Sequence, residues 1–150
     1  MRRLLAYGEG TAGGLMTPEV IILGPNATVA EALAHMRDPD WQVSIATQVF
    51  VTHPPFVSPT GTFLGVAPFQ RLLREPPSME LSKCVEDIVS VTPDATEREV
   101  AERLAAYNLM ALPVCDEAHR LVGAITVDDV LDRTLPPEWR QRHRPAERTA

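Results

Sequence analysis

The chain is poor in aromatic residues and cysteine, and acidic side chains outnumber basic ones. Only 5% of its 150 residues are aromatic, so a hydrophobic core has to be built from aliphatic residues. The two cysteines, Cys84 and Cys115, have no partners at zinc or redox spacing and indicate no oxidising compartment. A net charge of −6 argues against a surface for nucleic acid. It is compatible with cation binding, although most acidic soluble proteins bind no metal.

Long hydrophobic runs are missing as well. No segment approaches the roughly 20 consecutive apolar residues that a membrane-spanning helix needs. The apolar stretch Leu4–Ala6 is too short for the core of a signal peptide. We therefore expect a soluble chain in the cytoplasm.

Groups that carry catalysis are also absent. The four histidines show no metal-ligand spacing, and no Ser/His/Asp or Cys/His grouping is apparent. The chain has neither a glycine-rich phosphate loop nor a pair of catalytic carboxylates. We therefore expect a protein that is not an enzyme.

What the chain does contain is an internal repeat. Pro25–Thr28 returns as Pro93–Thr96, and Leu64–Val66 returns as Val122–Ala124. The first pair is offset by 68 residues and the second by 58, so the first unit is longer in its middle. Two units of this length are too few for a solenoid, which stacks three or more shorter repeats. The sequence predicts two related modules that pack on each other and bury a common core.

Each unit contains a capping box, in which a threonine and a glutamate three residues later cap the start of a helix. Thr28 with Glu31 and Thr96 with Glu99 have this spacing. Each unit should run strand, helix, strand, strand, helix. The expected strands are Val20–Leu23, Ile88–Val91, Met110–Cys115 and Leu121–Ile125, and the last helix is Val127–Arg133, capped by Thr126.

Four stretches of the sequence resemble known families. The run Leu112–Glu117 and the run Arg120–Asp132 resemble a cystathionine-β-synthase (CBS) domain. The stretch Leu4–Tyr7 and the motif Thr11–Glu19 resemble the junction in MgtE-type magnesium channels, where an N-terminal helical domain leads into a CBS pair.

The resemblance implies an α/β fold of two βαββα modules packed with pseudo-twofold symmetry, known as a Bateman module. We expect a connector from an upstream helical domain at 1–14, a divergent first CBS domain at 15–75 and a linker at 76–83. The second CBS domain then covers 84–135, and a charged tail covers 136–150.

The resemblance also implies a site for ATP, AMP or another adenine nucleotide in the second module. There Thr126 and Asp129 would contact ribose and phosphate, and Ser90 would add a hydroxyl. The adenine slot would be lined by Leu109, Met110 and Ala111. A simpler interpretation is that Thr126 and Asp129 cap the last helix and need no ligand. The first module has Pro68 and Arg71 where the hydroxyl and carboxylate should be, and Ile22 in place of Ser90's counterpart, so we expect one nucleotide at most.

For Mg²⁺, the candidate ligands are Asp128, Asp129 and Asp132 on the last helix. Like charges one turn apart are mildly unfavourable, which favours a counter-cation. The alternative is that acids near a helix start stabilise it through the helix dipole. Asn108, Thr96 and Arg98 stand where MgtE channels tend to place acids, so a reduced response is expected.

These expectations combine into a functional hypothesis. The chain would be a non-catalytic regulatory module of an MgtE-like magnesium-transport protein, the cytosolic part of an inner-membrane protein. It would sense Mg²⁺ and adenine nucleotide, and would change the conformation of a homodimer formed through the CBS helices. A membrane transport domain or other domains would complete the protein. The alternative is a soluble adenine-nucleotide sensor that regulates an unknown partner.

Overall fold

The computed structural model describes residues 8, 10–136 and 138, so residues 1–7 and 9 of the predicted connector and nearly all of the predicted tail lie outside it. The first half contains α2 (Ala12–Leu15), β1 (Ile22–Leu23), α3 (Val29–Met36), β2 (Gln48–Thr52), β3 (Phe63–Pro68) and α4 (Phe69–Arg74). The second half contains the 3-10 turn η1 (Leu81–Lys83), α5 (Glu97–Ala106), β4 (Ala111–Cys115), β5 (Leu121–Thr126) and α6 (Val127–Thr134).

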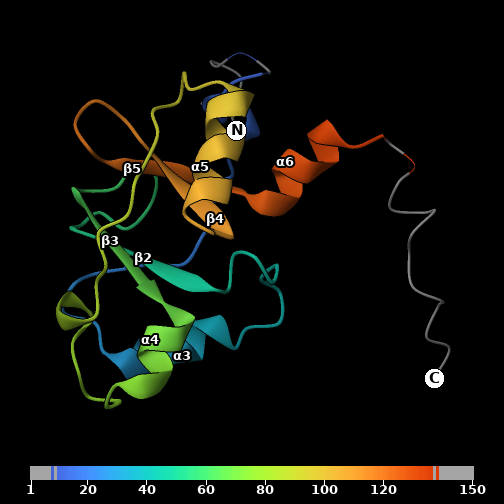
Figure 1. The fold of residues 1–150 in the computed structure, drawn as a ribbon. Coiled ribbons are helices and arrows are strands. Elements are labelled where there is room, and N and C mark those ends of the chain that lie inside the picture. The colour runs from blue at the N-terminus through green and yellow to red at the C-terminus, as the bar shows by residue number, and fades with distance from the viewer. Residues whose placement is uncertain (1–7, 9, 137, 139–150) are drawn as a thin grey trace, which may run out of the picture.

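Each half is a small sheet with two helices packed on it (Figure 1). In the first half the strand order is β1-β2-β3, with β1 parallel to β2 and β2 antiparallel to β3. In the second half β4 and β5 form an antiparallel pair. The helices α3 and α4 contact each other, as do α5 and α6. This is the mixed α/β architecture of two related modules that the repeat predicts.

The predicted helix starts are confirmed. Thr28 accepts a hydrogen bond from the backbone N–H of Glu31 at 3.2 Å, and the Glu31 carboxylate accepts one from Thr28 N at 3.3 Å. The box of Thr96 and Glu99 has both bonds at 3.1 Å. Because a cap satisfies N–H groups that have no partner within the helix, each box fixes where its helix begins.

The strand predicted over residues 88–91 is wrong except for its last residue, which forms a single parallel bridge with Val114 in β4. The ladder stops there because the next donor on β4 would be Pro113, which has no N–H. The backbone carbonyl of Ala111 in β4 accepts a hydrogen bond from Gln48 Nε2 at 3.1 Å, in place of one from a neighbouring strand. A side chain of the first module thus takes the place of a strand in the second.

The extra residues of the first module lie in two loops. Residues 37–47 join α3 to β2, whereas only residues 107–110 join α5 to β4. The hairpin between β2 and β3 spans residues 53–62, and its counterpart between β4 and β5 spans 116–120. The repeat is therefore preserved in the helices and strands, and the modules differ mainly in these connections.

The modules share buried residues, as the repeat predicts. The larger buried cluster is built mainly from the first module but includes five residues of the second: Cys84, Ala111, Cys115, Leu121 and Ala124. The remaining buried apolar residues of the second module form a smaller cluster that also contains Ala12 and Met16, from the chain before β1.

Each module is completed by the chain segment that precedes the other one. Thr17, which comes before β1, forms two backbone hydrogen bonds of 2.9 Å with Ala124 in β5. Glu86, which comes before α5, forms backbone hydrogen bonds of 2.7 and 3.0 Å with Val66 in β3. The two pairs occupy equivalent positions of the repeat, so the exchange of segments is reciprocal.

The same two segments also attach to the helix starts. The N–H of Ala12 donates to the carbonyl of Ala95, just before α5, at 2.8 Å. The N–H of Leu81 donates to the carbonyl of Ala27, just before α3, also at 2.8 Å. Both Ala12 and Leu81 are fully buried. The segment around Leu81, predicted as a linker, is therefore part of the packed structure.

The exchange explains why glycine recurs in Leu64–Val66 and Val122–Ala124. A Cβ on Gly123 would lie 2.8 Å from the carbonyl oxygen of Thr17. A Cβ on Gly65 would lie 2.6 Å from that of Glu86, and Gly65 has a φ of +139°, which side-chain-bearing residues rarely adopt. At both positions the exchanged segment passes too close for any side chain.

We expect Gly65→Ala and Gly123→Ala each to lower the free energy of unfolding by about 1–3 kcal/mol, because the new methyl group must displace backbone. Urea denaturation followed by circular dichroism measures the loss. Gly10→Ala is the control, since its Cβ would make an ordinary 3.5 Å contact with Glu97. An unchanged denaturation midpoint in Gly65→Ala or Gly123→Ala would contradict the close approach.

Candidate functional site

Two clefts related by the repeat lie between the modules. The first, which we call the acidic cleft, has a volume of about 400 Å³ and is lined by Thr17, Glu19, Asp38, Asp40, Trp41, Gln42, Ile45 and Asp129. The second, the amide cleft, has a volume of about 340 Å³ and is lined by Thr47, Gln48, Val66, Pro68, Phe69, Gln70, Glu86, Ile88, Asn108, Leu109 and Met110. Each cleft is lined by one of the exchanged segments and by the start of a helix from one module. The other module contributes the loop that joins its first helix to the next strand.

The acidic cleft carries four carboxylates. Asp129 comes from the first turn of α6, Glu19 from the exchanged segment, and Asp38 and Asp40 from the loop after α3. None of the described residues that line this cleft is lysine or arginine. A cleft lined by one sign of charge concentrates the opposite charge, so this one favours cations and disfavours free phosphate groups.

The loop of residues 37–47 is held against α6. Ser44 is 1% exposed, and its hydroxyl donates to Asp128 Oδ2 at 3.3 Å. Asp38 accepts a hydrogen bond from the N–H of Asp40 at 2.9 Å, which forms a tight turn in the lining of the cleft. The acidic wall of the cleft therefore belongs to a defined loop.

The residues predicted to bind nucleotide are divided between these clefts. Asp129 lines the acidic cleft, whereas Leu109 and Met110 line the amide cleft. Thr126 is fully buried and accepts a hydrogen bond from the N–H of Asp129 at 3.2 Å, so its hydroxyl caps α6. Ala111 is fully buried as well.

Ser90, the further predicted hydroxyl contact, is half-buried beside the thiol of Cys115. It is not among the described residues that line either cleft. Besides Asp129, the acidic cleft is lined by Trp41, Gln42 and Ile45, which the sequence did not indicate as site residues.

The three predicted metal ligands lie on α6. Asp128 and Asp132 are exposed, and Asp129 is half-buried. Among the residues that the structure describes, no three His, Cys, Asp or Glu side chains are grouped so that they could hold a metal ion directly. Since Mg²⁺ commonly keeps several waters and uses only one or two carboxylates, the donor types fit this ion without such a group.

Both cysteines are buried and neither forms a disulfide. Burial raises the pKa of the Cys115 thiol to about 11, and a hydrogen bond with Ser90 opposes this only in part. Because the thiolate is the reactive form, Cys115 is inert near neutral pH and acts as a packing residue.

Within the described part of the chain, no helix is long and apolar enough to cross a membrane.

Comparison with known proteins identifies the family. The CBS domain family matches residues 12–75 and 80–135. The magnesium transporter MgtE of Thermus thermophilus is 36% identical over 130 residues, which is 86% of this chain and 28% of that protein. MgtE of Enterococcus faecalis is 27% identical over 133 residues, 88% of this chain and again 28% of the relative.

Solved structures agree. The cytosolic domain of the Mg²⁺ channel MgtE in complex with ATP superposes with a TM-score of 0.75 at 36% identity, covering 88% of this chain and 52% of that one. The chain thus spans just over a quarter of the length of its MgtE relatives. With both halves of the repeat matched, the chain belongs to the CBS domain family as a tandem pair, similar to the cytosolic domain of MgtE.

Proposed function

We propose that this CBS pair is the non-catalytic regulatory module of a magnesium-transport protein, and that Mg²⁺ is its effector. The observation that carries the proposal is the acidic cleft, whose four carboxylates lie between the modules with no lysine or arginine among the described residues that line it. The similarity to MgtE supports the choice of ion. The full protein would contain a membrane transport domain, and this module would lie on its cytosolic side.

Magnesium would act by offsetting repulsion. Asp129 belongs to the second module, whereas Asp38 and Asp40 belong to the loop of the first. A divalent cation between them lowers the electrostatic cost of holding these elements together, and it can do so through bound waters. Because it binds the compact state better than the open one, it shifts the equilibrium towards the compact state.

Adenine nucleotide is the second ligand that we propose, supported by the ATP complex of the similar MgtE domain. Free ATP is a polyanion, and a cleft lined by carboxylates repels it. We therefore expect any nucleotide that contacts Asp129 to bind as its Mg²⁺ complex. The alternative of a soluble nucleotide sensor without a magnesium role requires nucleotide binding in the absence of Mg²⁺.

The proposal includes a homodimer formed through the CBS helices. An apolar groove of about 660 Å³ lies between α3, α4 and the loop 37–47, and its lining includes Leu33, Met36, Trp41, Phe69 and Leu73. Leu73 is 60% exposed, which is unusual for a large apolar side chain unless a partner covers it. A second copy of the chain is the partner that we propose.

Trp41 connects the acidic cleft with the apolar groove. Its side chain lines both the acidic cleft and the apolar groove, and Asp38 does the same. A cation that draws Asp38 towards Asp129 would therefore move a wall of the groove. This shared wall is the route by which we propose that Mg²⁺ alters the packing of the dimer.

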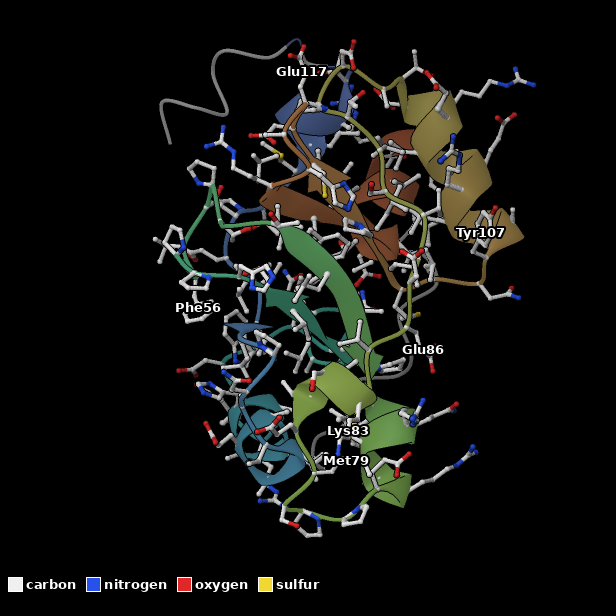
Figure 2. The ribbon with its side chains drawn as sticks, turned by 90° about the vertical axis from the view of Figure 1, so that its left-hand side faces the viewer. Phe56, Met79, Lys83, Glu86, Tyr107 and Glu117 are labelled. Atoms are coloured by element: carbon white, nitrogen blue, oxygen red, sulfur yellow. The ribbon has the colours of Figure 1, made fainter. Side chains whose placement is uncertain are left out.

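Magnesium binding can be followed by the fluorescence of Trp41 in a Trp139→Phe variant, which leaves Trp41 as the only tryptophan. We expect MgCl₂ to change the emission in the millimolar range, and Asp129→Asn to weaken the response about tenfold, the equivalent of ~1.4 kcal/mol. Glu117→Gln removes the same charge outside the acidic cleft (Figure 2) and serves as the control. Equal responses in the two variants, or an equal response to NaCl of matched ionic strength, would contradict the proposal.

Dimerisation can be tested by sedimentation velocity. We expect the native chain to dimerise more strongly in MgCl₂, and Leu73→Glu to abolish the dimer because it places a charge in the apolar groove. Val57→Glu is the control, since Val57 is 72% exposed and lies in the hairpin loop outside the groove. A native chain that stays monomeric, or equal effects of the two variants, would disprove this interface.

A further inference from the structure

Ser44 carries a buried hydroxyl that joins the two modules. Its side chain belongs to the loop 37–47 of the first module and is 1% exposed. The hydroxyl donates to Asp128 Oδ2, in the first turn of α6, at 3.3 Å. The two residues are 84 positions apart in the sequence, so this bond links the modules. Because a buried hydroxyl without a partner costs free energy, the loop can bury Ser44 only where Asp128 is within reach.

The acidic part of the loop is joined to Ser44 by two consecutive turns. The N–H of Trp41 donates to the carbonyl of Asp38 at 3.3 Å, which closes the first turn. The N–H of Ile45 donates to the carbonyl of Gln42 at 3.0 Å, which closes the second turn around Ser44. A displacement of Ser44 therefore carries the acidic part of the loop with it.

The end of the loop is fastened separately. The carbonyl of Thr47 accepts a hydrogen bond from the N–H of Phe69, at the start of α4, at 2.9 Å. The next residue, Gln48, donates its side-chain N–H to the carbonyl of Ala111 at 3.1 Å. These contacts fix where the loop leaves towards β2. The bond of Ser44 fixes how closely the rest of the loop lies against α6.

Ser44 thereby controls the spacing of carboxylates in the acidic cleft. Asp38 and Asp40 line this cleft from the loop, and Asp129 lines it from the residue next to Asp128. The carboxylates of the two modules repel each other, which favours a wider cleft. The hydrogen bond of Ser44 opposes this widening, and its acceptor is a carboxylate, which makes it stronger than a bond between neutral groups.

We propose that Ser44 is a positioning residue that makes the acidic cleft prefer Mg²⁺ over the larger Ca²⁺. This inference rests on the proposed function, since it takes the acidic cleft as the cation site. Mg²⁺ holds its oxygen ligands and waters in a near-ideal octahedron, whereas Ca²⁺ accepts more ligands in irregular arrangements. A fixed spacing of carboxylates therefore favours Mg²⁺, and a loosened loop loses this preference.

The test compares the dissociation constants of Ca²⁺ and Mg²⁺, followed by Trp41 fluorescence in the Trp139→Phe chain. We expect Ser44→Ala to weaken Mg²⁺ binding about tenfold and Ca²⁺ binding less, so that the ratio of the Ca²⁺ constant to the Mg²⁺ constant falls at least about threefold. The control is Ser82→Ala, which changes an exposed serine of η1 outside the acidic cleft and should keep the native ratio.

The outcomes separate this inference from the proposed function. A native ratio in Ser44→Ala would overturn the positioning role, and so would equal weakening of both ions, although either result leaves the magnesium site standing. A native chain whose fluorescence does not respond to Mg²⁺ would overturn the proposed function and this inference with it.

Substitutions of Asp128 test the same hydrogen bond from its other end, at an exposed position. Asp128→Asn removes the charge but keeps an oxygen that can accept from Ser44, whereas Asp128→Ala removes both. Both variants should bind Mg²⁺ more weakly, but only Asp128→Ala should lower the ratio as Ser44→Ala does. Adding Ser44→Ala to Asp128→Ala should lower it no further, because both changes break one bond. Equal ratios in Asp128→Asn and Asp128→Ala, or a further fall in the double variant, would overturn the proposal.

Discussion

Two pairs of backbone hydrogen bonds, between Thr17 and Ala124 and between Glu86 and Val66, hold this molecule together. In each pair a segment that precedes one module adds to the sheet of the other. Neither module can therefore pair all the backbone groups at its edge on its own, and unpaired buried groups are costly. This constraint explains the recurring glycines, the shared core and the burial of what looks from its sequence like a linker.

The same exchange builds the clefts. Thr17 begins a wall of the acidic cleft, and Glu86 begins the corresponding wall of the amide cleft. A ligand in either cleft therefore touches both modules, so its binding energy acts on how they pack. The two clefts occupy equivalent places in the repeat but differ in chemistry. Asp129, which lines the acidic cleft, corresponds in the repeat to Arg71, which donates to Glu75 and does not line the amide cleft.

The features that can be predicted from the sequence rest on local patterns. The capping boxes of Thr28 and Thr96 predict the helix starts, because a cap depends on short-range hydrogen bonds. The recurrence of these motifs along the chain predicts the two modules. The sequence could not show which loop faces which helix, since that follows from the exchange of segments. For this reason the resemblance groups Leu109 with Asp129, although these two residues line different clefts. The greater length of the connection at residues 37–47 is the feature of the sequence that could have indicated a role for this loop.

Native-state amide hydrogen exchange tests the central claim most directly. The N–H of Thr17 and the N–H of Glu86 are each donated to the opposite module, so neither can open unless the modules separate. We predict that both amides exchange with one opening free energy, equal to that of global unfolding. A much smaller opening free energy for either amide would contradict the claim that these segments unite the fold. Unfolding of one module while the other kept its protection would contradict it as well.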